Sequence, residues 1–272
     1  KLFKMVENTL NKIINKKEQK LNELKKIISI ESLKEKIKEN STFINFKEKI
    51  ENNIVNNKIS LIAEIKKASP SAGIIIKNYN PVEIASKYYF DGATCLSILT
   101  EEKFFFGCLD HIKMVKEKIK LPILCKDFII DTFQVPFAKS FGADAILIIL
   151  SAIDNNLAKE IYYAAIENNI SVIVEVHSEE EAEKALNFKK AIIGINNRNL
   201  KTLETDINIT YNLHKIVSEH QGPIIAESGI KSEENVKEII KKTNIKNFLI
   251  GESLLNNLGK QSLLKKILQI NQ

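Results

Sequence analysis

The chain has 272 residues, of which 44% are hydrophobic and 27% are charged, and its net charge is +6 at pH 7 with a pI near 8.9. These values are ordinary for a globular protein, and the length suits one large domain. No apolar run approaches the ~20 residues that a membrane span requires, and the N-terminus lacks the apolar region and cleavage site of a signal peptide. We therefore expect no membrane contact.

The cysteines and histidines offer no pattern of metal ligands. The three cysteines, Cys95, Cys108 and Cys125, lack CxxC spacing, and the four histidines form no ligand-spaced pair. A sparse, odd set of cysteines is typical of a reducing compartment, so we expect a cytoplasmic protein without disulfides or a bound metal. The lysines are mixed with glutamates, as on solvated helix faces. The positive charge therefore favours an anionic small molecule over nucleic acid, although a basic, non-catalytic RNA-binding protein is an alternative class.

Residues 1–57 are predicted to form helices. Segment 7–28 carries apolar residues at near-helical spacing. Segment 29–40 follows, with Ser29 or Ser32 as its N-cap, and segment 43–53 is a third short helix. No strand pattern occurs here, so we expect an N-terminal helical extension over 1–57 that packs on the domain after it.

Apolar, β-branched runs alternate with helical stretches over residues 58–272. Short links between them imply parallel βαβ units. About eight units over roughly 200 residues fit a single closed (β/α)8 barrel, the TIM-barrel fold. An open doubly wound sheet is the alternative, but the first strand leads into KKASPSAG rather than the GxGxxG turn of nucleotide-binding sheets. Strands are expected near 61–66, 94–99, 122–126, 144–150, 171–176, 191–195, 223–227 and 247–251.

Most of the predicted strands end in a polar or ionisable side chain. Two of them carry such residues two positions apart, so that both side chains of each pair project from one face of the strand. Any single residue of this kind is commonly an interior ion pair or a solvated rim group. Together, on successive strand ends of a barrel, they predict one catalytic mouth. The residues are Glu64, Lys66, Lys126, Glu175, Asn196 and Arg198.

A phosphate site is predicted at the ends of the last two strands, in ESGI (227–230) and IGES (250–253). The loops after strands seven and eight of such barrels often bind phosphate through backbone N–H groups. The only arginine of the chain, Arg198, offers the planar contact to an anion that lysine cannot copy. SPS (69–71) supplies hydroxyls to the same anion or only shapes a loop. The candidate substrate-binding residues here are Ser69, Glu227, Ser228, Gly229, Gly251 and Glu252.

Two of the strand-end residues are expected to have shifted pKa values. Lys126 follows apolar Ile123 and Leu124, and burial near another lysine would lower its pKa and suit it to proton donation. Glu175 follows Ile173 and Val174, and a semi-buried carboxylate has a raised pKa.

Three segments, AEIKKASPS, ILCKDFIID and GINNRNL, are highly specific in combination. With SILTEEKFFFG, IIAESGI and FLIGESLL, they make the chain resemble the indole-3-glycerol phosphate synthase family over nearly its whole length. That family also carries helices over the barrel mouth. The resemblance implies a carboxy-lyase that ring-closes, decarboxylates and dehydrates 1-(2-carboxyphenylamino)-1-deoxyribulose 5-phosphate to indole-3-glycerol phosphate in tryptophan biosynthesis. It implies a sugar-phosphate substrate and no cofactor, and we expect a monomer or weak homo-oligomer.

The resemblance also implies roles for single residues. Lys126 corresponds to the general acid that protonates the substrate carbonyl, and Glu175 to a proton-transfer carboxylate of the later steps. Glu64 and Lys66 correspond to a catalytic pair, with Lys66 near the substrate carboxylate and the departing hydroxyl. The remaining assignments are Asn196 and Arg198 to substrate orientation, Phe105 and Phe128 to the walls of the anthranilate ring, and Ser69, Ser228, Gly229, Gly251 and the backbone of Glu252 to the phosphate.

The chain departs from the family pattern at a few positions. Phe106 and Cys108 make FFFGC more apolar than usual, Ala72 stands where lysine is common, and Glu252 replaces a frequent serine, so only its N–H is assigned to phosphate. Other phosphate-binding barrels of tryptophan biosynthesis, phosphoribosylanthranilate isomerase and the tryptophan synthase α subunit, are the nearest alternatives. They do not explain AEIKKASPS together with ILCKDFIID.

Overall fold

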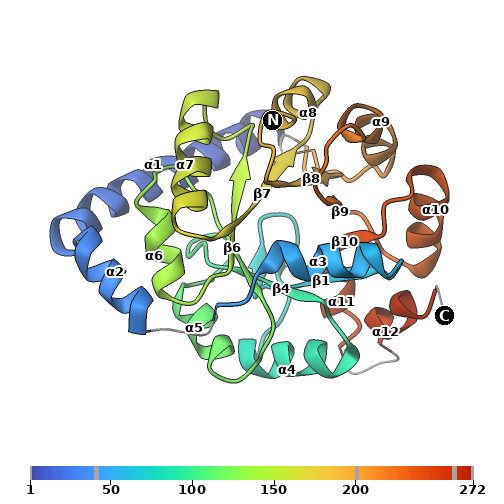
Figure 1. Cartoon of the computed structure of the whole chain (residues 1–272), viewed down its shortest axis with the longest axis horizontal. Helices are drawn as coiled ribbons and strands as arrows, with labels where there is room; N and C mark the ends of the chain where they lie inside the picture. The colour runs from blue at the N-terminus through green and yellow to red at the C-terminus, as the bar shows by residue number, and fades with distance from the viewer. Residues whose placement is uncertain (1, 40–42, 200–201, 259–261, 271–272) are drawn as a thin grey trace.

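Eight parallel strands close into a barrel in the computed structural model, which describes residues 2–39, 43–199, 202–258 and 262–270. Neighbouring strands follow the chain order from β4 to β10, and β1 closes the ring between β10 and β4. Figure 1 shows the strands at the centre with the helices around them. The closed ring confirms the predicted barrel and excludes the open sheet.

Each strand of the barrel lies within one residue of its predicted bounds. The strands are β1 (Ser60–Ile65), β4 (Cys95–Leu99), β5 (Ile123–Lys126), β6 (Ala145–Ile149), β7 (Ser171–Val176), β8 (Ile192–Asn196), β9 (Ile224–Glu227) and β10 (Asn247–Ile250). The helices after β1 are α4 (Pro81–Asp91), α5 (Asp110–Lys116), α6 (Gln134–Ser140), α7 (Asn155–Glu167), α8 (Glu179–Ala185), α9 (Asn208–Val217), α10 (Glu233–Thr243), α11 (Glu252–Leu255) and α12 (Leu263–Leu268).

Side-chain caps set where several helices begin. The side chains of Asn80, Asp154, Ser178 and Ser232 accept hydrogen bonds from backbone N–H groups of α4, α7, α8 and α10. Such caps satisfy N–H groups that have no partner within the helix. Helix α4 ends at Gly92, whose φ of 96° lies in the left-handed region that glycine adopts without a Cβ clash.

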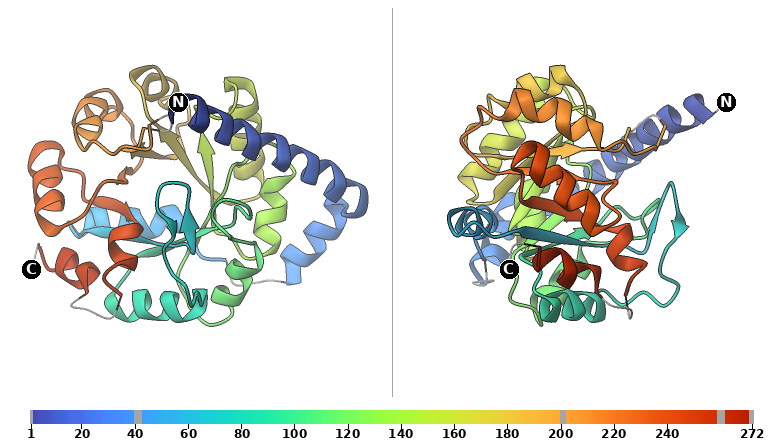
Figure 2. Two further views of the ribbon diagram at one scale, coloured as in Figure 1. Left: turned by 180° about the vertical axis from the view of Figure 1, so that it is seen from behind. Right: turned by 90° about the vertical axis from the view of Figure 1, so that its right-hand side faces the viewer.

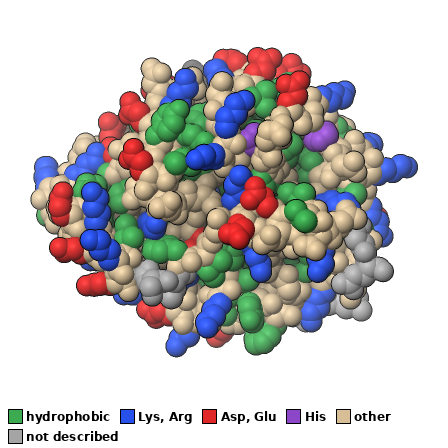
Figure 3. All heavy atoms as spheres, in the orientation of Figure 1, with side chains coloured by type: hydrophobic (Ala, Val, Ile, Leu, Met, Phe, Trp, Pro, Cys, Tyr) green, Lys and Arg blue, Asp and Glu red, His purple; other side chains and the backbone are tan. Residues whose placement is uncertain are grey.

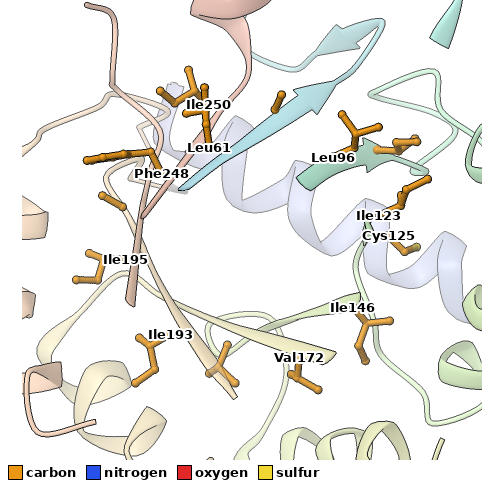
Figure 4. Close-up of a cluster of buried hydrophobic side chains, with 14 of the residues drawn as sticks. Leu61, Leu96, Ile123, Cys125, Ile146, Val172, Ile193, Ile195, Phe248 and Ile250 are labelled. Atoms are coloured by element: carbon orange, nitrogen blue, oxygen red, sulfur yellow. The ribbon is translucent and has the colours of Figure 1, made fainter. Parts of the chain in front are cut away.

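Two apolar layers hold the barrel together. The larger layer fills the space between the strands and the surrounding helices, and Figure 4 shows its side chains pointing away from the barrel centre, among them Leu61, Leu96 and Ile193. A smaller cluster fills the interior, including Ile62, Leu124 and Leu147. Because side chains alternate along a strand, the same strands supply both layers. The apolar interior leaves the strand ends for polar groups.

The N-terminal segment forms three helices, α1 (Leu2–Ile27), α2 (Ile30–Glu39) and α3 (Phe46–Val55). Ser29 is the N-cap of α2, because its Oγ accepts a hydrogen bond from the N–H of Ser32. Phe46 and Ile50 of α3 are fully buried against the barrel interior. The N–H of Lys47 on the same helix bonds Ser171, at the start of β7. Helix α3 therefore closes the N-terminal end of the barrel.

Helix α1 lies at the opposite, C-terminal end. Lys17 contacts Asp127 at 2.5 Å, and Lys20 and Lys25 pair with Glu102 and Asp131, in the loops after β4 and β5. The edge-on view in Figure 2 shows α1 and the β2–β3 hairpin (Ala68–Ser69 and Gly73–Ile74) on one side of the barrel, with α3 on the other. The hairpin and the short helix α11 were not predicted, because segments of two to four residues carry no periodic pattern.

The surface visible in Figure 3 mixes charges of both signs, with lysines interspersed among aspartates and glutamates. Among the described residues, no helix has the length and apolar character that crossing a membrane requires.

Candidate active site

Four ionisable side chains from four strands meet inside the C-terminal mouth of the barrel. The Nζ of Lys126, at the end of β5, lies 2.8 Å from Glu227 Oε2, 3.6 Å from Glu175 Oε2 and 3.7 Å from Glu64 Oε2. The four side chains are between 0% and 15% exposed. The parallel strands bring their inward-facing ends to one rim, which places these residues together although they are far apart in the sequence.

Lys66 extends this cluster toward solvent. Its Nζ donates to Glu64 Oε1 at 2.6 Å, so the Glu64 carboxylate lies between two lysines. Gly251 permits this arrangement, because a Cβ at that position would lie 2.3 Å from Glu64 Oε1. The residue after β10 must therefore be glycine for the Glu64–Lys66 pair to lie where it does.

The pKa shifts of the cluster differ from those expected from the sequence. Burial alone would lower the pKa of Lys126, but the carboxylates of Glu227, Glu175 and Glu64 outweigh it, and the pKa rises. The prediction of a lowered lysine pKa was therefore wrong. Burial raises the pKa of Glu175, but Lys126 and His177 outweigh it and lower that pKa to about 2. The expected rise was wrong here too, because the sequence did not show that cations would face this carboxylate.

Glu227 is the carboxylate whose pKa is raised. It is fully buried at the end of β9, and burial, together with the negative charge of Glu175, raises its pKa to about 7 despite the contact with Lys126. Its carboxylate occupies space left by Gly194, where a Cβ would lie 2.1 Å from Glu227 Oε1. A carboxyl group with a pKa near neutrality exchanges protons readily at physiological pH.

Asn196 is the last residue of β8, and Arg198 follows it by two positions, as Lys66 follows Glu64. The Asn196 side chain interacts with Glu175, and its Oδ1 accepts a hydrogen bond from the N–H of Arg198 at 3.0 Å. The Arg198 guanidinium donates to the carbonyl of Leu203 at 2.7 Å and to Ser71 Oγ at 3.4 Å. The arginine is thus held at the rim, next to the open part of the site.

A cavity of about 450 Å³ opens beside Glu64 and Lys66. Ser228 and Gly229, after β9, have φ values of 63° and 71°, so the chain turns sharply at the cavity wall. Asn197 fixes this turn, because its Nδ2 donates to the carbonyl of Ser228 at 3.1 Å. The predicted residues that line the cavity are Glu64, Lys66, Arg198, Ser228, Gly229, Gly251 and Glu252.

Four predicted substrate-binding residues, Ser69, Phe105, Phe128 and Glu227, do not line this cavity. Ser69 is buried, and its Oγ accepts a hydrogen bond from the N–H of Ala72 at 3.1 Å, so it shapes the turn after β1. Phe105 and Phe128 are half-buried, the former in the loop after β4 and the latter against the interior cluster. Lys126, Glu175, Asn196 and Glu227 lie deeper, in or beside the ionisable cluster.

Sequence reasoning missed several residues of the site. Ser71, Thr205 and Lys231 line the cavity, and His177 contacts Glu175 at 3.2 Å. Ser71 belongs to the SPS segment, so the signal was present but was assigned to the first serine. Among the described residues, no group of three or more histidine, cysteine or acidic side chains is arranged to hold a metal ion.

Comparison with known proteins adds to this geometry. A model of indole-3-glycerol phosphate synthase sequences matches residues 10–267 of the chain. The chain belongs to this family. It is 37% identical over 264 residues to the indole-3-glycerol phosphate synthase of Zymomonas mobilis subsp. pomaceae, with 97% of this chain and 99% of that relative covered. It is 44% identical over 203 residues to that of Legionella pneumophila strain Lens, with 74% and 78% covered.

Solved structures agree with the fold. The tryptophan synthase subunit alpha of Legionella pneumophila strain Paris superposes with a TM-score of 0.60 over 83% of this chain and 97% of its own. The two sequences are only 13% identical, so this likeness concerns the barrel alone.

Proposed function

We propose that this indole-3-glycerol phosphate synthase, a carboxy-lyase of tryptophan biosynthesis, carries out its reaction at the ionisable cluster in the barrel mouth. The observation that supports this most is the single lysine ammonium of Lys126 within 4 Å of three carboxylates, beside an open cavity. The substrate is 1-(2-carboxyphenylamino)-1-deoxyribulose 5-phosphate, and the product is indole-3-glycerol phosphate.

Lys126 acts as the general acid of ring closure. The ring carbon that bears the carboxylate attacks the substrate carbonyl, and Lys126 donates a proton to the carbonyl oxygen as the new bond forms. Its raised pKa keeps the side chain in the ammonium form that donation needs. The iminium formed on ring closure accepts the electrons released as CO₂ leaves, so no cofactor is required. Lys66 lies close enough to the cavity to bind the substrate carboxylate.

Glu175 and Lys66 serve the later dehydration. Lys66 assists departure of the hydroxyl as water, with Glu64 orienting its ammonium at 2.6 Å. Glu175 accepts the proton that the ring system loses, and its lowered pKa supplies the ionised form. Asn196 orients Glu175 and the substrate. Lys126 thus serves the ring closure, and Lys66, Glu64 and Glu175 serve the dehydration.

The phosphate binds at the rim, against Arg198 and the turns after β9 and β10. Ser228, Gly229 and Gly251 allow close backbone approach, and Glu252 contributes only its N–H. Ser69 does not contact the phosphate in this scheme. Its Oγ accepts a hydrogen bond from the N–H of Ala72 and lies 3.2 Å from Ser71 Oγ, so it stabilises the turn that carries Ser71. Phe105 and Phe128 form the walls of the anthranilate site.

We further propose that residues 1–57 work as an extension of a catalytic barrel over residues 58–272, since α1 pairs with loops at the mouth. Three unpaired cysteines support a cytoplasmic location. We propose a monomer or weak homo-oligomer that has no nucleic-acid partner.

The test is direct. Purified protein is mixed with the carboxyphenylamino substrate, and formation of indole-3-glycerol phosphate is followed, with Lys126→Ala as the control. We expect turnover by the wild type and none by the variant. A folded wild type without turnover would contradict the proposal.

A further inference from the structure

His177 lies between two carboxylates at the edge of the candidate active site. Its Nε2 is 3.2 Å from Glu175 Oε1, and its Nδ1 is 3.3 Å from Oε2 of Glu181 on α8. The side chain of Glu175 is 3% exposed, that of His177 10% and that of Glu181 17%. The three groups therefore form a row from the buried cluster toward the surface.

The Glu181 side chain also stabilises the start of helix α8, independently of any role in the reaction. Its Oε2 accepts a hydrogen bond from the backbone N–H of His177 at 2.8 Å, and Ser178 accepts one from the N–H of Glu181 at 3.3 Å. This pattern is a close variant of the capping box that starts many helices. A neutral glutamine at position 181 still accepts the backbone bond, so it preserves the cap and removes only the charge.

The charge balance of the cluster favours a protonated imidazole at His177. Among the described residues, the lysines that pair with Glu64, Glu175 and Glu227 are Lys66 and Lys126. The groups around Glu175 are Lys126 from β5, Asn196 from β8, Glu227 from β9 and His177, which directly follows β7. An imidazolium between Glu175 and Glu181 supplies the missing positive charge on the side of Glu175 that faces away from Lys126.

We propose that His177, held in place by Glu181, is a positioning residue that directs Glu175 at the substrate. The inference rests on the proposed role of Glu175 as a base. His177 does not touch the reacting atoms in this scheme. It acts through the carboxylate beside it, much as hydrogen-bonded carboxylates orient catalytic imidazoles in other enzymes, with the roles of the two groups reversed.

The titration behaviour of the four histidines agrees with this geometry. Burial lowers the pKa of His177, but the hydrogen bonds and charges of Glu175 and Glu181 outweigh it and raise the pKa to about 9. Burial lowers the pKa values of His111, His214 and His220 below the ordinary range. His177 is thus the one histidine of the chain expected to stay charged at neutral pH.

An NMR titration tests the charge of His177 without using activity. In protein with isotope-labelled histidine, we expect one imidazole to titrate near pH 9 and three to titrate below about 6.5. Glu181→Gln should lower the high value by at least one pH unit, because it removes one of the two negative partners. Glu180→Gln is the matched control, since Glu180 is an exposed neighbour on α8 that pairs with Lys184.

A comparison of kcat with KM tests the effect on Glu175. In His177→Gln, Glu175 loses one cationic partner, but its pKa of about 2 and the Lys126 ammonium 3.6 Å away leave it ionised at neutral pH. We expect kcat at the pH optimum to fall at least tenfold because the carboxylate is no longer directed at the substrate, with KM changed less than twofold. His220→Gln is the control for a lost buried hydrogen bond, because His220 bonds the carbonyl of Ala191 at 2.8 Å.

The outcomes separate this inference from the proposed function. A wild-type enzyme in which all histidines are neutral at pH 8 overturns the role of His177, and so does a folded His177→Gln variant with an unchanged kcat. If His177→Gln does not fold, an unchanged histidine titration in Glu181→Gln has the same consequence. Absence of turnover in the wild type contradicts the proposed function itself.

Discussion

Replacing the buried carboxyl group of Glu227 with an amide should make the protein more stable at alkaline pH. Glu227 is fully buried and its pKa is raised to about 7 from an ordinary value of 4.5. A group whose pKa is higher in the folded state contributes stability below its unfolded pKa and loses that contribution as the pH rises through the folded pKa. The wild type should therefore lose stability between about pH 4.5 and pH 7, and Glu227→Gln should not.

The size of the effect follows from the shift. Each pKa unit corresponds to about 1.4 kcal/mol, so a rise from 4.5 to about 7 costs the wild type about 3 kcal/mol at pH 8. For a chain of this size, each kcal/mol changes the melting temperature by roughly 2–4 °C. Glu227→Gln should therefore melt roughly 6–12 °C higher at pH 8, and the free-energy gain should fall below about 1 kcal/mol by pH 5.

Thermal unfolding at pH 5 and pH 8 measures this difference directly. Glu180→Gln, at an exposed position, is the control for a change in net charge and should melt within about 1–2 °C of the wild type at both pH values. A Glu227→Gln variant that is no more stable at pH 8, or whose gain is the same at pH 5, would refute the reasoning. The Lys126–Glu227 ion pair would then be worth more than the burial of the carboxylate costs.

Three further substitutions test the site. Lys126→Met should lower kcat by about 10²–10⁴ in a saturated assay, because it removes the general acid, and a rate within tenfold of the wild type would contradict that role. Arg198→Ala should raise KM by roughly 10–100-fold, the value of a charge-assisted hydrogen bond to phosphate, and an unchanged kcat/KM would mean that Arg198 binds nothing important. Gly251→Ala places a Cβ 2.3 Å from Glu64 Oε1 and displaces that carboxylate, so kcat/KM should fall at least tenfold with little change in melting temperature. Wild-type kinetics in this variant would show that the position of Glu64 does not matter for the reaction.

The barrel was predictable from the sequence because each strand and each helix has its own local pattern of residues, and these patterns repeat along the chain. Each apolar run identifies a strand within one residue, and eight of them in alternation with helices leave few topologies. The strand ends then place Glu64, Lys126 and Glu175 at one rim without further information. The resemblance to a known family, carried by three motifs, agreed with this reading of the residues.

The electrostatics of the site were not predictable in this way. Lys126 and Glu227 are 101 positions apart, and their contact depends on how strands face one another across the barrel. The sign of each pKa shift depends on those contacts. Burial, together with a neighbouring lysine in the case of Lys126, gave the wrong sign of the pKa shift for both Lys126 and Glu175. His177 was missed for the same reason, although the spacing of Ser178 and Glu181 is a visible sign of a helix start.

The pairing of β1 with β10 also governs when activity can arise during synthesis. Ser60 lies beside Asn247 in the closed ring, and Glu64 lies against Gly251. During synthesis on the ribosome, β1 emerges long before β10. Until β10 follows, one edge of β1 is unpaired and its apolar face is exposed. The ring, and with it the contact between Glu64 and Gly251, can therefore form only after β10 has been synthesised.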